Sequence, residues 1–105
     1  MKRRVAILGS TGSIGKQALE VISRHPELFE VVTLTANTNA QLLIKQAKEF
    51  DPDSVVIANE SKYEEVFNAL DPLGIKVFTG EDSISEIVKS STIDLVLTAM
   101  VGFSG

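Results

Sequence analysis

The residues best suited to chemistry in this sequence are three glycines spaced three residues apart, Gly9, Gly12 and Gly15. They follow the apolar run at residues 5–8 and open a segment of helical periodicity, a context that predicts a strand, a tight turn and a helix N-terminus. In such a turn the first glycine permits the sharp bend, the second lets a pyrophosphate approach the backbone, and the third lets the helix pack closely on the strand. Unpaired N–H groups at the helix N-terminus attract the anion. The pattern therefore predicts dinucleotide binding.

The residues around the glycines refine this prediction. Ser10, Thr11 and Ser13 are expected to add hydroxyl donors near the phosphates. The sequence argues against a magnesium-dependent P-loop, because Lys16 is followed by Gln17, which lacks the hydroxyl that would hold the metal ion. Lys16 is instead expected on the solvated face of the helix.

The choice of cofactor depends on the end of the second expected strand, about twenty residues after the turn, where an NAD site places an acid against the ribose 2′-hydroxyl. This chain has Asn37, Thr38 and Asn39 there, and Glu30 lies at the wrong end of the strand. Because no carboxylate repels a 2′-phosphate and amide and hydroxyl donors take its place, we expect NADP to be favoured over NAD. A simpler interpretation stays open, in which Asn37 and Asn39 are turn and cap residues, and it fits either cofactor.

Strand-like and helix-like segments alternate along the whole chain. Apolar and β-branched runs predict strands at residues 5–8, 29–36, 54–58, 75–78 and 93–97. Amphipathic segments between them predict four helices, the first turning Ile14, Ala18, Val21 and Ile22 toward the sheet. Connections this short imply a Rossmann-like, doubly wound α/β fold, with about five parallel strands covered on both faces. Because no helix follows the last strand, the fold is expected to be truncated at its C-terminus.

The bulk properties place limits on partners and location. A length of 105 residues allows one domain, expected to span residues 1–105. The net charge is −4 and the basic residues cluster only at Lys2, Arg3 and Arg4, which we interpret as a solvated flank, so no nucleic-acid partner is expected. No apolar run approaches the roughly 18 residues of a membrane span, so no membrane partner is expected. The chain has no cysteine, which removes disulfides and thiolate chemistry and fits a cytoplasmic protein.

No residue of the chain stands out as catalytic, and no group stands out as a metal site. His25 has no acid or serine partner in the pattern and is expected at a helix end. Tyr63 lies on the apolar stripe of the third helix and is expected in the core. The acidic pairs in the chain fit exposed or first-turn helix positions, where carboxylates favour solubility and interact well with the helix dipole.

Longer motifs give the chain a family resemblance. They are the string from Val5 to Gly15, the segment His25-Pro26-Glu27 with Phe29 and Val31-Val32, the loop from Ala36 to Asn39, and Asp94 with the stretch Gly102-Phe103-Ser104-Gly105. Over all 105 residues the chain resembles the N-terminal, cofactor-binding part of the 1-deoxy-D-xylulose 5-phosphate reductoisomerase family. The string Gly-Ser-Thr-Gly-Ser-Ile-Gly is more specific than a general Rossmann turn.

The resemblance implies positions for the parts of NADPH. The residues implied to hold the pyrophosphate are Thr11, Gly12, Ser13 and Ile14, and those implied to hold the adenosine ribose and its 2′-phosphate are Asn37, Thr38 and Asn39. The family often has glycine at the position of Asn37 and sometimes a basic residue at that of Thr38, so this chain differs at both. Met100, Val101 and Gly102 would approach the nicotinamide.

The resemblance also implies an activity that this stretch alone does not carry out. The family converts 1-deoxyxylulose 5-phosphate to 2-C-methylerythritol 4-phosphate in non-mevalonate isoprenoid biosynthesis, by skeletal rearrangement and hydride transfer. Its divalent-metal carboxylates, for Mg or Mn, and its substrate loop lie beyond Gly105, so residues 1–105 are expected to be an inactive part of a longer, homodimeric oxidoreductase acting on a phosphosugar. Two alternatives stay open, a free-standing NADP-binding sensor module and another NADP-linked dehydrogenase, such as a semialdehyde dehydrogenase.

Overall fold

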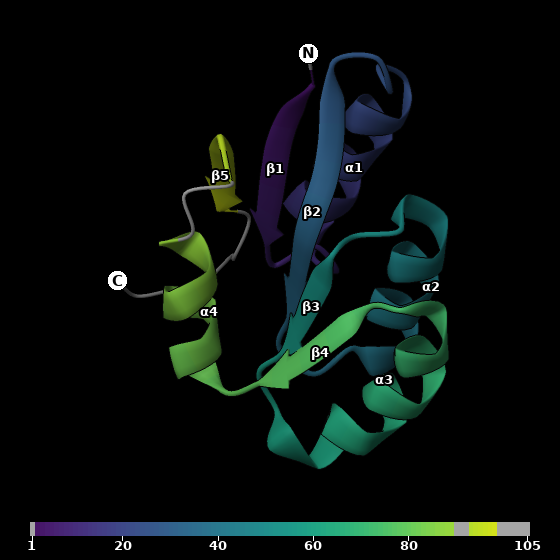
Figure 1. Cartoon of the computed structure of the whole chain (residues 1–105), viewed down its shortest axis with the longest axis vertical. Coiled ribbons are helices and arrows are strands. Elements are labelled where there is room, and N and C mark those ends of the chain that lie inside the picture. Colours follow the sequence, from purple (N-terminus) through teal and green to yellow (C-terminus); the bar gives the residue numbers. More distant parts are fainter. Residues whose placement is uncertain (1, 90–92, 99–105) are drawn as a thin grey trace.

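Short apolar and β-branched runs form a parallel sheet, and the amphipathic segments between them form helices (Figure 1). The computed structural model describes residues 2–89 and 93–98. Every predicted strand is confirmed, with ends that differ by at most two residues. The strands are β1 (Arg3–Leu8), β2 (Phe29–Ala36), β3 (Ser54–Ile57), β4 (Lys76–Thr79) and β5 (Leu95–Thr98). The helices are α1 (Ser13–Ser23), α2 (Ala40–Phe50), α3 (Tyr63–Leu70) and α4 (Glu81–Val88), and in the described residues none is long and apolar enough to cross a membrane.

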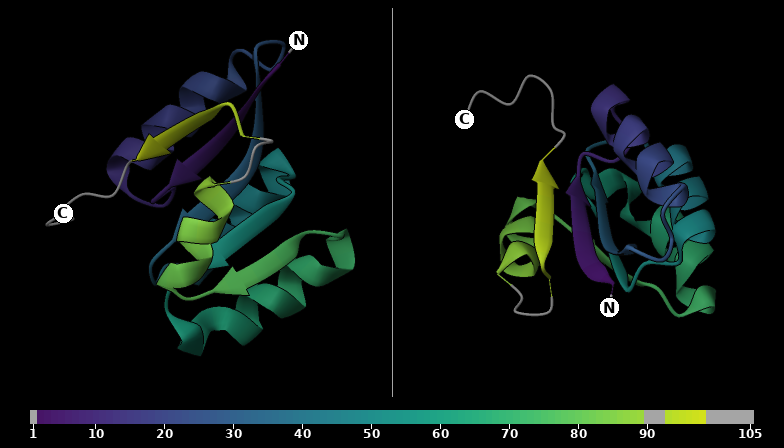
Figure 2. Two further views of the ribbon diagram at one scale, coloured as in Figure 1. Left: turned by 60° about the vertical axis from the view of Figure 1, so that its left-hand side comes forward. Right: turned by 90° about the horizontal axis from the view of Figure 1, so that it is seen from above.

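The sheet winds in two directions from β1. The strand order is β4-β3-β2-β1-β5, and every neighbouring pair is parallel. The chain therefore moves outward from β1 to β4 and then returns to the far side of β1 as β5. Helices α1, α2 and α3 lie together on one face of the sheet, whereas α4 lies on the opposite face (Figure 2). This arrangement confirms the doubly wound α/β fold.

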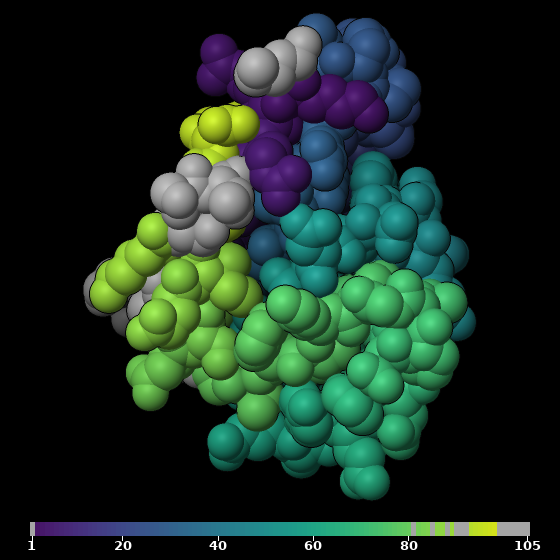
Figure 3. Space-filling model, viewed as in Figure 1, coloured from purple at the N-terminus to yellow at the C-terminus, as the bar shows by residue number. Residues whose placement is uncertain are grey.

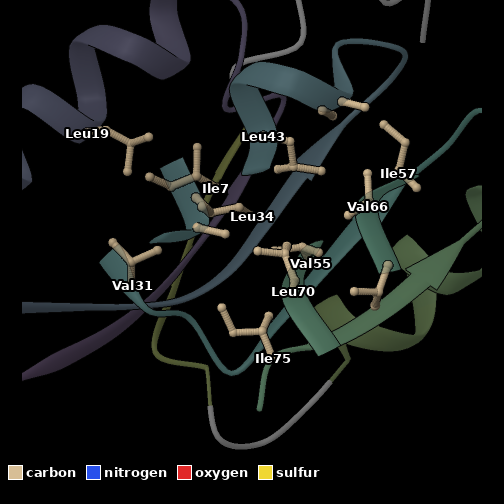
Figure 4. Packing of buried hydrophobic residues seen from close by; sticks show 14 of the residues in the cluster. Ile7, Leu19, Val31, Leu34, Leu43, Val55, Ile57, Val66, Leu70 and Ile75 are labelled. Atoms are coloured by element: carbon tan, nitrogen blue, oxygen red, sulfur yellow. The ribbon is translucent and has the colours of Figure 1, made fainter. Parts of the chain in front are cut away.

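The main core lies between the sheet and helices α1 to α3. Branched aliphatic side chains of β1, β2 and β3 point toward apolar side chains of the helices (Figure 4). In a core packed this densely, the loss of even one buried methylene group changes the free energy of unfolding. Side chains of this cluster with no more than 3% of their surface exposed include Val5, Ile7, Leu19, Leu34, Leu43, Val55, Ile57, Val66, Leu70 and Ile75.

Helix α1 is rotated relative to the sequence prediction. Ile14 and Val21 were expected against the sheet, but 53% and 52% of their surfaces are exposed. The buried stripe consists instead of Gly15, Leu19 and Ile22, which recur at i, i+4 and i+7. The prediction is confirmed for Ile22 and for Ala18, which packs against the core. It was wrong for Ile14 and Val21, because apolar residues occur on two adjacent faces of this helix and the contact at Gly15 selects the face that meets the sheet.

A β-bulge adjusts β2 to the core. Val5 of β1 is opposite Val31, but the next residue, Ala6, is opposite Thr33, so Val32 is the extra residue. One inserted residue reverses the alternation of side chains along a strand. As a result Val31 and Leu34 both join the core, although they are three positions apart and would lie on opposite faces of a regular strand.

An ion-pair cluster joins the strands at the amino edge of the sheet. The Arg4 guanidinium lies 3.3 Å from the Glu30 carboxylate and 2.8 Å from that of Asp53. The backbone N–H of Arg4 also donates to the Asp94 carboxylate at 2.9 Å, and Asp94 N–H donates to the Arg4 carbonyl at 2.8 Å. The interpretation of Arg4 as part of a solvated flank was therefore wrong. Glu30 does lie at the opposite edge from the loops that follow β1 and β2, as the sequence indicated.

The rotation of α1 leads to a stability prediction. Leu19→Ala is expected to lower the free energy of unfolding by about 2–5 kcal/mol, because it leaves a cavity between α1 and the sheet. Val21→Ala, on the exposed face of the same helix, is expected to change that free energy by less than about 0.5 kcal/mol. Urea unfolding followed by circular dichroism measures both. A larger loss for Val21→Ala than for Leu19→Ala would show that α1 has the other orientation.

Candidate functional site

The candidate site lies at the carboxyl edge of the sheet, beside the strand where the winding reverses. β1 has β2 on one side and β5 on the other, with Leu8 opposite both Thr35 and Thr98. In open α/β sheets, ligands bind outside the carboxyl ends of the strands at such a reversal. The loop at residues 9–12 leaves β1 at this point, and the loop at residues 37–39 leaves the neighbouring β2. The topology thus places the two predicted binding segments at one edge.

The glycine turn is fixed to β2 by its own backbone. Gly9 has a φ of +83°, a conformation that a residue with a side chain rarely adopts. Its N–H donates to the carbonyl and the hydroxyl of Thr35, at 3.1 and 3.0 Å, and Ser10 N–H donates to the same carbonyl at 2.8 Å. The turn closes with a bond of 3.2 Å from Gly12 N–H to the Gly9 carbonyl. The turn is therefore held in place before any ligand arrives.

Gly15 brings α1 against the turn. A methyl group at this position would lie 2.6 Å from the Cα atom of Ser10 and would also collide with the Gly9 carbonyl oxygen. Real side chains do not approach backbone atoms so closely, so only glycine fits here. This contact carries out the third role predicted for the glycine pattern, because it seats the helix N-terminus directly on the turn.

The N-terminus of α1 presents donors to solvent. Its first backbone hydrogen bond runs from Lys16 N–H to the Gly12 carbonyl at 2.9 Å. Among the described residues, no acceptor takes the N–H groups of Thr11, Ser13 or Ile14, and Gly12 at the N-cap has no side chain to do so. Such unpaired donors, at the positive end of the helix dipole, form an anion site. The high exposure of Ile14 fits a contribution through its N–H rather than its side chain.

The hydroxyl of Ser10 faces away from this site, contrary to the prediction that it joins the phosphate donors. Ser10 is fully buried, and its Oγ donates to Oε1 of Gln46 at 2.7 Å and lies 3.3 Å from the Thr35 carbonyl oxygen. Gln46 also donates from Nε2 to the Ser10 carbonyl at 2.9 Å. Sequence reasoning missed both Thr35 and Gln46. The available signal was a glutamine on the buried stripe of α2, between Leu43 and Ala47.

The loop after β2 is exposed and uncharged. Asn37, Thr38 and Asn39 are all exposed. Asn39 caps α2, because its Oδ1 accepts from Leu42 N–H at 3.2 Å, and the Asn37 carbonyl accepts from Asn59 N–H at 2.9 Å. The cap role proposed for Asn39 is thus present, and the Asn39 side-chain amide keeps its N–H donors. These three residues lie at the same edge as the glycine turn, so both sets of predicted contacts are available to one extended ligand.

Other candidate positions lie apart from this edge. His25 follows α1, and its Nδ1 is 3.8 Å from the Glu27 carboxylate. Tyr63 is partly buried and stacks on Phe67 with ring centroids 5.6 Å apart. Within residues 2–89 and 93–98, no three His, Cys, Asp or Glu side chains converge in a way that could hold a metal ion. Met100, Val101 and Gly102, expected near the nicotinamide, lie outside the described residues.

A cavity of about 830 Å³ lies elsewhere, between α4 and the face of β2, β3 and β4 that α1 to α3 leave open. α4 and β4 both lie on the face that Figure 3 shows. The lining includes Val32, Phe78 and Ile87, together with residues that precede β3 and β4 in the chain. It therefore opens toward the amino edge of the sheet and is separate from the glycine turn.

Known proteins are similar to this chain along its length. A family model described as 1-deoxy-D-xylulose 5-phosphate reductoisomerase matches residues 5–105. The protein of that name from Phocaeicola vulgatus is 56% identical over 105 residues, and the chain spans only 28% of its length. The solved reductoisomerase of Zymomonas mobilis in complex with NADPH is 36% identical with a TM-score of 0.78, over 82% of this chain and 23% of that one. A solved DOX-P reductoisomerase in complex with NADPH, fosmidomycin and magnesium is 27% identical with a TM-score of 0.88, over 93% and 24% of the two chains.

The contact at Gly15 leads to a second stability prediction. Alanine favours a helix over glycine by about 1 kcal/mol, but the collision with the turn is expected to make Gly15→Ala destabilising by about 1–3 kcal/mol. Gln17→Ala, at an exposed position of the same helix, serves as the control and is expected to change stability by less than about 0.5 kcal/mol. Urea unfolding measures both variants. A stabilised Gly15→Ala variant would show that α1 does not touch the turn.

Proposed function

The chain belongs to the 1-deoxy-D-xylulose 5-phosphate reductoisomerase family, and we propose that residues 1–105 serve as the NADPH-binding domain of such an enzyme. The observation that carries the proposal is the glycine turn at the reversal of the sheet, where an exposed helix N-terminus presents backbone N–H groups that have no acceptor among the described residues. A pyrophosphate bears the negative charge that this arrangement favours. The similarity to solved proteins in complex with NADPH supports the same assignment.

The two exposed loops bind different parts of NADPH. The backbone N–H groups of Thr11, Ser13 and Ile14 bind the pyrophosphate, and Gly12 lets it approach the turn. Asn37, Thr38 and Asn39 bind the adenosine ribose and its 2′-phosphate through amide and hydroxyl donors. No carboxylate follows β2 at this edge, since Glu30 is held by Arg4 at the other end of the strand. The 2′-phosphate therefore meets no repelling charge in this loop.

The proposed reaction of the whole enzyme is the conversion of 1-deoxyxylulose 5-phosphate to 2-C-methylerythritol 4-phosphate. NADPH, when bound, supplies the hydride that reduces the rearranged intermediate, while the residues described above bind and orient the cofactor. The described residues hold no cluster of metal ligands, so we assign them no part in binding magnesium or manganese. A phosphosugar substrate and a homodimeric assembly are proposed on the family resemblance alone, and a cytoplasmic location on a composition without cysteine.

Family membership favours this function over the two alternatives. A free-standing NADP-binding sensor would need the same glycine turn but no relationship to a reductoisomerase, and a different NADP-linked dehydrogenase would be expected to match a different family. The match covers residues 5–105, which include both exposed loops of the candidate site.

The uncharged loop after β2 predicts the cofactor preference. The chain is expected to bind NADPH more tightly than NADH, and Thr38→Asp is expected to reduce that preference by about tenfold, because a carboxylate repels the 2′-phosphate. Thr38→Val removes the hydroxyl without adding charge, so it separates the loss of the hydroxyl from the charge repulsion. It is expected to reduce the preference for NADPH less than Thr38→Asp does. Titration calorimetry with each dinucleotide gives the affinities. Equal binding of NADPH and NADH by the unaltered chain would contradict the proposal for this loop.

The position of Gly12 predicts a different effect. Its φ of −78° is open to any residue, so a larger side chain blocks the ligand without straining the backbone. Gly12→Val is therefore expected to weaken NADPH and NADH alike, by about tenfold or more, with little change in thermal stability. The same titrations and a thermal melt measure this. If only NADPH binding weakened, the pyrophosphate would lie elsewhere.

A further inference from the structure

A buried glutamine of α2 forms its side-chain hydrogen bonds with Ser10 of the glycine turn. Gln46 is only 6% exposed and lies on the apolar stripe that faces the core. Both ends of its amide bond to Ser10, because Oε1 accepts from the Ser10 hydroxyl at 2.7 Å and Nε2 donates to the Ser10 carbonyl at 2.9 Å. Leaving such a polar group in a core is unfavourable unless its hydrogen bonds are made, and here all of them involve one residue.

The bond to the Ser10 carbonyl determines where the next N–H points. A trans peptide is planar, so its carbonyl and its N–H point in opposite directions. Because Gln46 draws the Ser10 carbonyl into the protein, the N–H of Thr11 in the same peptide is directed outward. Among the described residues, that N–H has no acceptor.

No other side chain or backbone group of the described residues holds this carbonyl. Thr35 accepts from the N–H groups of Gly9 and Ser10, which fixes the two preceding peptides. The carbonyl between Ser10 and Thr11 bonds only to Gln46 in the part of the chain that the structure describes. Without Gln46 this peptide could rotate, and its carbonyl oxygen would then face the anion site.

We propose that Gln46 is a positioning residue for the cofactor, which orients the Ser10–Thr11 peptide so that Thr11 N–H donates to the pyrophosphate. The proposal rests on the proposed function, because it assumes that NADPH binds at this turn. Gln46 never touches the cofactor. Its hydrogen bond also polarises the peptide, which strengthens Thr11 N–H as a donor to an anion.

The test compares variants of the full chain with a matched control. Gln46→Leu removes both hydrogen bonds and puts an apolar side chain of similar size in place of the amide. This variant is expected to bind ADP-ribose and NADPH about tenfold more weakly. Thr33→Val is the control, because it removes the buried hydroxyl of Thr33 in β2 and its 3.1 Å hydrogen bond with the partly buried hydroxyl of Ser54 in β3. It is expected to change these affinities by less than about twofold, while thermal melts compare the losses of stability.

A third variant separates orientation from packing. Gln46→Glu cannot donate to the Ser10 carbonyl while it is ionised, but the protonated acid can. Burial raises the pKa of such a carboxyl, so its binding of ADP-ribose is expected to recover as the pH falls from about 8 to about 5.5. ADP-ribose is the probe because its pyrophosphate does not change charge over this range. The unaltered chain is expected to show no such recovery.

Amide measurements without ligand make the outcomes distinct. The N–H residual dipolar coupling of Thr11 is expected to differ between the unaltered chain and Gln46→Leu, because the peptide turns. An unchanged coupling, or affinities of Gln46→Leu within about twofold of the unaltered chain, would overturn the proposal. Failure of the unaltered chain to bind NADPH or ADP-ribose would instead contradict the proposed function, and the dipolar couplings would still decide whether Gln46 orients the peptide.

Discussion

The close approach of α1 to the turn at residues 9–12 is the constraint on which the rest of the site depends. Gly15 has no side chain, so the helix lies directly on the backbone of Gly9 and Ser10. This contact rotates the helix until Leu19 and Ile22 meet the sheet, and it places the first N–H groups of the helix at the carboxyl edge. One packing requirement therefore determines the core face of α1 and the position of its anion-binding end together.

Much of the fold could be predicted because strands and loops carry local signals. The run of apolar residues in β1 and the cap at Asn39 are readable from the sequence alone. The orientation of α1 was not readable, because Ile14 and Val21 are as apolar as the residues that replace them in the core. The buried role of Ser10 was also missed, since its partner Gln46 lies 36 residues away. A hydrogen bond across that distance depends on packing, which no local pattern reports.

A cluster of ion pairs lies at the amino edge of the sheet, away from the glycine turn. There, Arg4 of β1 forms ion pairs with Glu30 of β2 and with Asp53, which directly precedes β3. The exposed loops at the carboxyl edge contain no carboxylate at residues 9–12 or 37–39. A chain with a net charge of −4 can thus present a site for an anion, because the local field there arises from backbone dipoles rather than from lysine or arginine.

The reversal of the sheet at β1 also has a consequence for synthesis on the ribosome. β1 pairs with β5, and the contact between Arg4 and Asp94 spans 90 residues. At about 5–20 residues per second, roughly 5 to 20 seconds pass between the appearance of the two strands. During that interval one edge of an apolar strand, with Val5, Ala6 and Ile7 destined for complete burial, has no partner strand. An unpaired apolar edge favours aggregation, so a strand that is buried in the finished protein needs protection while the chain is being made.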